Sequence, residues 1–207
     1  MTTLYYTKGT CADVVLMTAT ALSLDLKLIN VDISKAIPIT EDGTDFTTIN
    51  PKGYVPALKL DNGTVITEVS AICAYLSELK PHNSIFPLSG SALVDQLQWF
   101  NYLATEIHKN YMPLIYRLFG VNVGNEWPPI VEATLQKRYQ YIDQLLAKQS
   151  FLTGNKLTSA DFYLFMTTIW ANKVDYDLNC FSNILKHRDL MLQNPIVNEL
   201  YPITKKK

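Results

Sequence analysis

The fold is decided by residues 50–70, which read NPKGYVPALKLDNGTVITEVS. Two short apolar runs flank the pair Asn62-Gly63, a pattern typical of a β-hairpin, and the second run leads into a helix N-terminus at Glu68. Pro56 lies where the first strand should begin, and a proline cannot donate a hydrogen bond to a strand ladder. If the bond between Val55 and Pro56 is cis, the Val55 backbone turns out of the sheet and exposes its N–H and C=O groups.

This stretch allows two interpretations. Free N–H groups at the start of the helix after Glu68 favour a bound carboxylate, so an exposed strand edge beside them suits a peptide-like ligand. An ordinary hairpin with a trans proline is an equal alternative from these residues alone, because only about 5–6% of X–Pro bonds in folded proteins are cis. The stretch therefore predicts a hairpin and a helix and leaves the ligand open.

The composition limits the class of the protein. The chain has 207 residues, of which 18 are basic and 19 acidic, with a formal net charge of -1. This balance gives no electrostatic reason to expect nucleic acid or an anionic membrane as a partner. Three widely spaced cysteines fit a reducing compartment, and the sequence has neither a signal-peptide pattern nor a run of about 18 apolar residues. We therefore expect a soluble cytoplasmic protein, with the lysines at 205–207 as a solvated end.

An α/β domain is predicted for residues 1–81. Residues 3–6 and 26–31 are β-prone runs, and between them apolar residues recur at a helical spacing over residues 11–24. Because a helix crosses over between the two strands, we expect the strands to be parallel, as in a βαβ unit. Residues 34–49 show no clean period and are expected to form a loop or a poorly regular helix. The hairpin and its helix then complete a βαβ-ββα order.

After a linker over residues 82–90, residues 91–207 are expected to form an all-helical domain. One long helix is predicted over residues 91–119, with an apolar stripe that consists of Leu93, Leu97, Phe100, Ala104 and Ile107. A second helix opens at Pro128-Pro129. Thr158 and Asp161 form a capping-box pattern before a helix that is apolar nearly all round, which marks the centre of a bundle. A further helix over residues 181–192 and a short one after Pro195 complete the domain.

Cys11 is the strongest candidate for chemistry. A thiol at a helix N-terminus has its thiolate stabilised by the free N–H groups and the helix dipole, and the thiolate is the reactive form. The alternative is that Cys11 is a small buried hydrophobic residue, which is the commoner fate of a lone cysteine. Cys73 and Cys180 are interpreted in that second way.

The histidines form no metal-binding pattern. His108 lies in the first long helix and is a candidate polar contact or acid–base group, whereas His82 and His187 are interpreted as surface residues. Glu106 and His108 are two positions apart and point to different faces of a helix, so we expect no metal site. The sequence contains no glycine-rich nucleotide loop and no GxSxG motif, which removes the usual nucleotide-binding and serine-hydrolase interpretations.

Five stretches carry a family resemblance: YYTKGTC at 5–11, NPKGYVPAL at 50–58, TEVSAI at 67–72, WFNYLATEIHK at 99–109 and LTSAD at 157–161. Together, and in this order over nearly the whole chain, they resemble the bacterial beta-class glutathione S-transferases. The helical His-Lys motif separates this class from relatives that use tyrosine or serine. The resemblance implies a thioredoxin-like N-terminal domain, a helical-bundle C-terminal domain and a homodimer that binds glutathione as co-substrate without a metal.

The resemblance also implies roles for residues of the N-terminal domain. Cys11 matches the cysteine that faces the glutathione sulfur. Val55 matches the residue before a cis-proline, here Pro56, whose backbone pairs with the cysteinyl part of glutathione. Glu68 and Val69 match the pair at the helix start that holds the γ-glutamyl carboxylate.

Further roles follow from the resemblance for a loop residue and for the helical domain. Lys35 matches a lysine that binds the glycine carboxylate. Asn101, Thr105, Glu106 and His108 match the helical wall of the site, part of which is offered across the dimer.

Two departures from the family pattern bear on these roles. Val69 stands where the family usually has serine or glycine, which removes a hydroxyl but leaves the backbone N–H. Asp13 follows Cys11 closely, and its like charge raises the thiol pKa against the lowering by the helix N-terminus. The sequence leaves the balance of these two effects open.

The main hypothesis is therefore a glutathione transferase that conjugates the glutathione thiolate to small hydrophobic electrophiles. Thiol-disulfide or peroxidase chemistry through Cys11 is an expected side activity. The alternative is a non-catalytic protein of the same fold that binds a protein partner.

Overall fold

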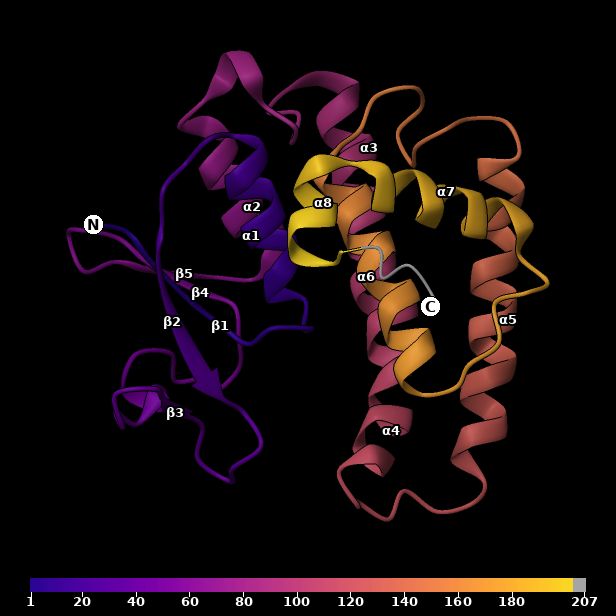
Figure 1. The fold of residues 1–207 in the computed structure, drawn as a ribbon, viewed down its shortest axis with the longest axis horizontal. Coiled ribbons are helices and arrows are strands. Elements are labelled where there is room, and N and C mark those ends of the chain that lie inside the picture. Colours follow the sequence, from indigo (N-terminus) through magenta and orange to yellow (C-terminus); the bar gives the residue numbers. More distant parts are fainter. Residues whose placement is uncertain (203–207) are drawn as a thin grey trace. The chain divides into compact units, whose positions relative to one another are not determined.

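The structure is a computed structural model that describes residues 1–202, so the lysines at 205–207 lie outside the described residues. The chain divides into two compact units, Met1–Leu88 and Ser89–Lys207. The first is an α/β unit and the second is helical, as predicted (Figure 1). Within the described residues, no helix is long and apolar enough to cross a membrane.

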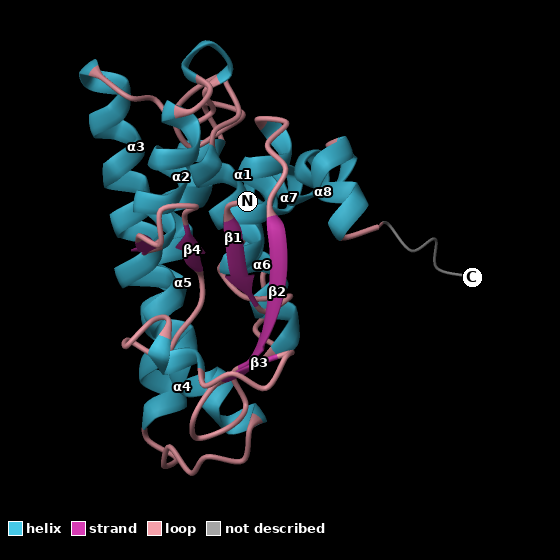
Figure 2. Cartoon of the chain, turned by 90° about the vertical axis from the view of Figure 1, so that its left-hand side faces the viewer, coloured by secondary structure: helices cyan, strands magenta, loops and turns pink. Residues whose placement is uncertain are grey.

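The N-terminal unit contains a five-stranded sheet in the order β3-β2-β1-β4-β5. Its strands are β1 (Thr3–Tyr6), β2 (Lys27–Asp32), β3 (Ile39–Thr40), β4 (Ala57–Lys59) and β5 (Val65–Thr67). The pair β1 and β2 is parallel, and the other neighbouring pairs are antiparallel. Figure 2 shows β2, β1 and β4 side by side. The predicted βαβ unit and the predicted hairpin are therefore confirmed.

Helices α1 (Ala12–Ala21) and α2 (Val69–Glu78) pack against each other in this unit, and a short 3-10 helix, η2 (Pro81–Asn83), follows α2. The segment 34–49, expected to be a loop or a poorly regular helix, contains the short 3-10 helix η1 (Phe46–Thr48) and also the strand β3, which was not expected. The ring of Phe46 is buried, with its centroid 5.6 Å from that of Tyr5, so this segment contributes to the core. Elements of two and three residues are too short to produce a period in the sequence.

The helices of the C-terminal unit are α3 (Gly90–Tyr102), α4 (Lys109–Leu118), α5 (Trp127–Leu146), α6 (Ser159–Lys173), α7 (Ser182–Gln193) and α8 (Pro195–Leu200). The predicted single helix over residues 91–119 contains a π-helical segment, η3 (Leu103–His108), between α3 and α4. An apolar stripe over so few residues does not distinguish an α-helical from a π-helical turn. Such segments occur often at functional sites.

The buried face of α3 also differs from the predicted stripe. Gln96 and Phe100 are its buried residues, whereas Leu97 is 40% exposed. Positions 96 and 97 lie four and three residues before Phe100, and both spacings place a residue on the same side of a helix. The hydrophobicity of Leu97 favours this residue for the buried face, but the packing of the bundle buries Gln96 instead.

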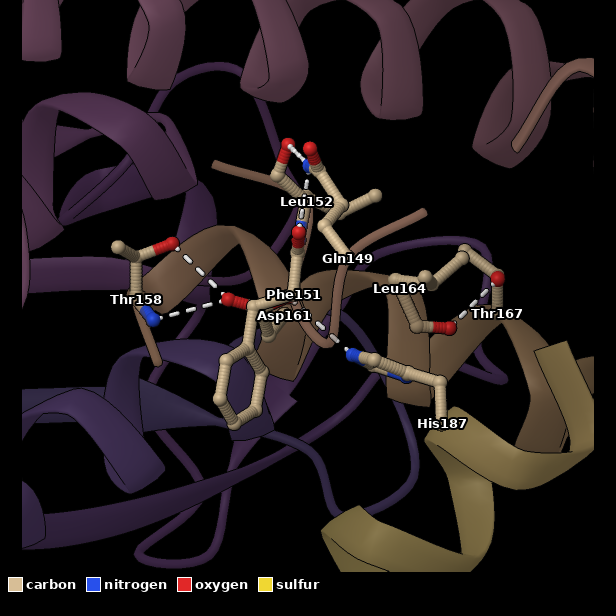
Figure 3. Close-up of polar contacts among 8 residues, drawn as sticks. All are labelled: Gln149, Phe151, Leu152, Thr158, Asp161, Leu164, Thr167 and His187. Atoms are coloured by element: carbon tan, nitrogen blue, oxygen red, sulfur yellow. Dashed lines mark hydrogen bonds and ion pairs between the residues drawn. The ribbon is translucent and has the colours of Figure 1, made fainter. Parts of the chain in front are cut away.

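The start of α6 confirms the predicted capping box. The carboxylate of Asp161 accepts hydrogen bonds from the backbone N–H of Thr158 at 2.9 Å and from that of Leu152 at 2.8 Å. Figure 3 shows that His187 of α7 approaches the same carboxylate, with Nε2 3.2 Å from Oδ1. His187 is only 3% exposed, so its interpretation as a surface residue is wrong. A buried carboxylate needs hydrogen-bond partners, and the tertiary fold provides His187 as one of them.

Candidate functional site

The thiol of Cys11 and the backbone of Val55 meet in the N-terminal unit. Cys11 is the N-cap residue of α1, as predicted, and is 9% exposed. Its Sγ atom lies 3.7 Å from the carbonyl oxygen of Val55. The bond between Val55 and Pro56 is cis, which confirms the expectation that the resemblance raised. This arrangement places a thiol, a helix N-terminus and the backbone before the cis-proline together.

The loop before α1 is shaped by short polar side chains. The hydroxyl of Thr7 donates to the carbonyl of Val31 at 2.5 Å, and that of Thr10 donates to the carbonyl of Thr7 at 2.7 Å. The carboxylate of Asp13, which is buried, accepts the backbone N–H of Gly9 at 2.8 Å. Asp13 thus helps to hold the turn that presents Cys11.

The loop before Val55 is organised by Asn50. The buried side chain of Asn50 donates from Nδ2 to the carbonyl of Tyr54 at 2.7 Å and accepts the N–H of Lys52 at 3.2 Å. Gly53 has a φ of 72°, a conformation that other residues rarely adopt. These contacts close a tight turn immediately before Val55.

Glu68 lies at the same end of the sheet as Val55. The pairing of Ala57 with Thr67 in the hairpin places Pro56 across from Glu68. Glu68 is the N-cap residue of α2, as predicted, with a φ of 72°. A glutamate in this region of backbone space is unusual and points to a functional constraint.

Two residues beside Glu68 were not predicted as part of the site. Lys52 Nζ lies 2.6 Å from Glu68 Oε1 and 2.9 Å from Thr67 Oγ1, and the Tyr54 hydroxyl lies 3.2 Å from the same Glu68 oxygen. The hydrogen bond to Glu68 raises the pKa of Lys52. Both residues belong to the stretch 50–70. The predicted antiparallel hairpin brings residues 52–54 close to Glu68, so this pattern could have identified them from the sequence. The helix start thus combines a carboxylate with an ammonium group.

Val69 and Lys35 complete the set predicted for this unit. Val69 is the first residue of α2, and its apolar side chain is buried. Lys35 lies in the turn after β2, and its Nζ atom is 3.6 Å from the carboxylate of Asp32. The role of Lys35 toward a glycine carboxylate stays a prediction.

The predicted residues of the C-terminal unit lie at the junction of α3 and η3. Asn101 is exposed, and its carbonyl accepts the hydroxyl of Thr105 at 2.9 Å. Glu106 forms an ion pair of 2.7 Å with Arg138 of α5. Because the segment is π-helical after Tyr102, these residues are spaced differently from those of a regular helix.

His108, the last residue of η3, is held by aromatic neighbours from α6. Its Nδ1 atom lies 2.9 Å from the hydroxyl of Tyr163, and its ring centroid is 4.5 Å from that of Trp170. Burial, with a smaller contribution from the charge of Lys109, lowers the pKa of His108 to about 4. The imidazole is therefore neutral at neutral pH, which suits a hydrogen-bonding role.

The other cysteines and histidines lie elsewhere. Cys73 is buried in α2, as predicted, and burial raises its thiol pKa to about 12. Cys180 lies in a loop, but it is exposed rather than buried, because the loop keeps it at the surface. His82 is exposed, as predicted. Over residues 1–202, no group of three or more His, Cys, Asp or Glu side chains is placed to hold a metal ion.

Two family models match the chain. The glutathione S-transferase N-terminal domain model matches residues 10–79, and the C-terminal domain model matches residues 105–199. Among curated proteins, the chain is 34% identical over 197 residues to glutathione S-transferase GstA of Escherichia coli O157:H7, which covers 95% of each chain. These matches favour the transferase interpretation over the alternative of a non-catalytic binding protein.

Solved structures give the same result. A sphingomonad glutathione S-transferase in complex with glutathione is 28% identical, with a TM-score of 0.87 over 96% of both chains. The bacterial beta-class glutathione S-transferase of Sphingomonas chungbukensis is 26% identical, with a TM-score of 0.85 over the same share of both chains. Since sequence and structure agree over nearly the full length, the chain belongs to the glutathione S-transferase family and resembles its bacterial beta class.

Proposed function

We propose that this transferase holds glutathione at the end of the sheet where Cys11, Val55 and Glu68 meet, and conjugates its thiolate to small hydrophobic electrophiles. The observation that carries the proposal is the contact of 3.7 Å between the Cys11 thiol and the carbonyl before the cis-proline. The cysteinyl part of glutathione pairs with the backbone of Val55, which brings its sulfur toward Cys11. The solved relative with bound glutathione supports glutathione as the co-substrate.

The γ-glutamyl end of glutathione carries one ammonium and one carboxylate. The start of α2 offers the carboxylate of Glu68 for the first and the backbone N–H groups from Val69 onward for the second. Because Val69 has no hydroxyl, the backbone and the nearby ammonium of Lys52 supply the favourable interactions for the anion. Lys35 binds the glycine carboxylate at the other end of the tripeptide.

Catalysis requires that the glutathione thiol loses its proton and that its thiolate attacks the electrophile. The N–H groups at the start of α1 stabilise the negative charge near Cys11. The family resemblance assigns Asn101, Thr105, Glu106 and His108 of the C-terminal unit to glutathione as well, part of them across the dimer. A new carbon–sulfur bond forms as the leaving group departs or the epoxide opens.

The test is direct binding and turnover. The purified protein should bind to immobilised glutathione and should conjugate glutathione to members of a panel of aryl halides and epoxides. Failure in both assays would overturn the proposed function. The Glu68→Gln variant, which leaves Val55 and Pro56 unchanged, tests whether this binding depends on the proposed site.

A second activity is favoured by the position of Cys11 at a helix N-terminus. We infer that the Cys11 thiolate attacks the glutathione sulfur of a mixed disulfide between glutathione and a small thiol, forms a disulfide between Cys11 and glutathione, and releases the small thiol as its thiolate. A second glutathione thiolate then restores Cys11 and releases oxidised glutathione. Mass spectrometry after incubation with such a mixed disulfide should detect the adduct on Cys11, and its absence would remove this activity.

We also propose that the protein acts as a homodimer in the cytoplasm. Val94 and Leu97 of α3 are 55% and 40% exposed, and they lie on the same face of the helix as Asn101. An exposed apolar stripe that continues into a predicted binding residue supports a subunit interface there. The cytoplasmic location is supported by the odd number of cysteines.

A further inference from the structure

Asp13 is a buried carboxylate in the first turn of α1, two positions after Cys11. The residue is only 1% exposed, although an aspartate is almost never fully buried unless it has partners. Its Oδ2 atom accepts the backbone N–H of Gly9 at 2.8 Å, across the turn that leads into the helix. The carboxylate is therefore held inside the same turn that carries the thiol.

This turn gives Cys11 a defined position. Gly9 has a φ of 81°, a conformation that glycine adopts readily, and its N–H is held by Asp13. The hydroxyl of Thr10 accepts the N–H of Ala12, the first residue of α1, at 3.2 Å. Because the residues before and after it are fixed by hydrogen bonds, Cys11 meets its surroundings in one orientation.

The sulfur of Cys11 faces an acceptor. Its Sγ atom lies 3.7 Å from the carbonyl oxygen of Val55, and the residue is 9% exposed. Only the neutral thiol can donate to a carbonyl, whereas a thiolate would bring its charge against the negative end of the C=O dipole. Burial also disfavours the charged form, because it removes water from the sulfur. The contact therefore fits Cys11 as a thiol.

The N-terminus of α1 and the carboxylate of Asp13 act on this thiol in opposite directions. The helix dipole favours the thiolate and is the source of the reactivity proposed above. The Asp13 carboxylate disfavours the thiolate, because water screens like charges little in a buried site. The N–H of Gly9 favours the ionised form of Asp13 itself. An anion is thus placed at the positive end of the helix.

Further ionisable residues lie on the segments next to the thiol, and each is accounted for. Lys8, in the preceding turn, is exposed, so its charge is screened by water. Lys52, on the loop before the cis-proline, forms an ion pair of 2.6 Å with Glu68. Tyr5 and Tyr6 of β1 carry phenols, a group that is uncharged at neutral pH. The buried carboxylate of the first turn is therefore the charge that opposes the helix dipole.

We propose that Asp13 is a positioning residue that holds Cys11 as a neutral thiol against the Val55 carbonyl and thereby limits disulfide exchange through Cys11 at neutral pH. The part of this inference that concerns exchange rests on the proposed second activity. The protonation of Cys11 is measured without glutathione. Removal of the Asp13 charge should leave the helix dipole unopposed, so a larger fraction of Cys11 becomes thiolate.

The first test is the pH dependence of Cys11 alkylation by iodoacetamide. Mass spectrometry of the digested protein quantifies the product at Cys11 separately from that at the exposed Cys180. In the wild type, the midpoint of the Cys11 profile should lie above that of an ordinary cysteine, about 8.5. A wild-type midpoint below that of an ordinary cysteine would overturn the inference.

The variant Asp13→Asn removes the charge and keeps an oxygen that accepts the N–H of Gly9. Its midpoint should be lower than that of the wild type by about one pH unit, which corresponds to a roughly tenfold larger thiolate fraction at neutral pH. An unchanged midpoint contradicts the inference. If the variant does not fold, the wild-type midpoint still decides whether Cys11 is held as a thiol.

The matched control is Asp45→Asn. Asp45 also accepts a backbone N–H, that of Thr47 at 2.8 Å, but it pairs with the edge strand β3, which β2 separates from β1. This variant should leave the Cys11 profile in place. Asp13→Ala, which removes the charge and the acceptor together, separates charge from shape. If Asp13→Ala changes the profile and Asp13→Asn does not, Asp13 acts through the shape of the turn alone and the inference fails.

The second test measures the rate at which Cys11 attacks a mixed disulfide of glutathione and a small thiol. At about pH 7, Asp13→Asn should react about three- to fourfold faster than the wild type, less than the gain in thiolate, because a less basic thiolate is a weaker nucleophile. Asp45→Asn should react at the wild-type rate. Equal rates in the wild type and in Asp13→Asn would contradict the inference.

The outcomes separate this inference from the proposed function. If the wild type shows the raised midpoint but binds no glutathione, the proposed function fails and the effect of Asp13 on Cys11 stands. If the wild type conjugates glutathione but Cys11 titrates below an ordinary cysteine, the proposed function stands and the inference about Asp13 fails.

Discussion

The Sγ atom of Cys11 lies 3.7 Å from the carbonyl oxygen of Val55, and this contact joins two segments that are 44 residues apart. It connects the N-terminus of α1 to the residue before the cis-proline. A thiol that donates to this carbonyl lies beside the strand edge on which the cysteinyl part of glutathione is proposed to bind. Two reactions, conjugation and disulfide exchange, therefore depend on Cys11 to different extents.

Substitution of Cys11 by alanine should separate the two reactions. Disulfide exchange should fall to the background rate, because the mixed disulfide has no sulfur on which to form. Conjugation should persist at a reduced rate, since the N–H groups at the start of α1 still stabilise the thiolate of glutathione. Parallel assays with an aryl halide and with a mixed disulfide of glutathione and a small thiol measure both. Equal loss of the two activities would show that Cys11 is essential for conjugation as well.

The substitution Glu68→Gln should weaken glutathione binding about tenfold or more, because a hydrogen bond to a charged group contributes about 1.5–3 kcal/mol. The amide keeps the size of the side chain and removes the charge that faces the ligand ammonium. Calorimetric titration with glutathione measures the affinity. An unchanged dissociation constant would exclude Glu68 from the recognition of the γ-glutamyl group.

Lys52→Met is the companion of that variant, because Lys52 contacts the same Glu68 oxygen at 2.6 Å. Its effect on affinity should be smaller, since ion pairs between exposed side chains contribute little. The residual effect should diminish as salt is added, because exposed charges are screened. A loss as large as that of Glu68→Gln would contradict this ranking and would show that the Lys52 ammonium contributes as much to glutathione binding as the Glu68 carboxylate.

Protonation of His108 should destabilise the protein in acid. Its pKa is lowered from 6.5 to about 4, mainly by burial. Between these values the unfolded chain binds a proton that the folded chain does not, so stability is full above pH 6.5 and declines as pH falls toward 4. The loss is at most on the order of 3 kcal/mol. Urea unfolding at about pH 7.5, above this window, and at about pH 5, within it, measures the loss.

His108→Asn is the control for this pH dependence. The variant should be less sensitive to the change of pH than the wild type, because the asparagine does not titrate in this range. If the two proteins lose the same stability between the two pH values, another group causes the acid sensitivity.

The substitution Asp161→Ala should destabilise the protein by about 3 kcal/mol or more, because each buried donor left without an acceptor costs about 1–3 kcal/mol. It removes the acceptor for the N–H groups of Thr158 and Leu152 and the partner of His187. Asp189→Ala is the matched control. This carboxylate of α7 is exposed, so its removal should change the free energy of unfolding little. Urea denaturation curves compare the two. A small effect of Asp161→Ala would mean that water replaces the carboxylate.

The homodimer is tested by Val94→Glu. A carboxylate in the centre of an apolar interface is costly to bury, so the variant should elute as a monomer where the wild type elutes as a dimer. Light scattering after size-exclusion chromatography gives the mass of each. Asp95→Ala, an exposed change on the next residue, should not alter the wild-type mass. A dimeric Val94→Glu variant would place the interface elsewhere.

Most secondary-structure elements were predicted correctly from local signals. The Asn62-Gly63 turn, the proline pair at the start of α5 and the capping box at Thr158 all appear in the structure. Of the predicted site residues of the N-terminal unit, Cys11 contacts Val55, and Glu68 lies across from Pro56. The π-helical segment and β3 escaped prediction, because each is too short for a period to be recognised.

The sequence by itself determined most of the helices and strands and the family resemblance, because turns, caps and helix starts depend on residues only a few positions apart. Only the tertiary structure decided which polar groups meet. His108 pairs with Tyr163 across 55 positions and His187 pairs with Asp161 across 26, and no local pattern relates such residues. The burial of these groups, and therefore the low pKa of His108, arises from the packing of the helices against one another.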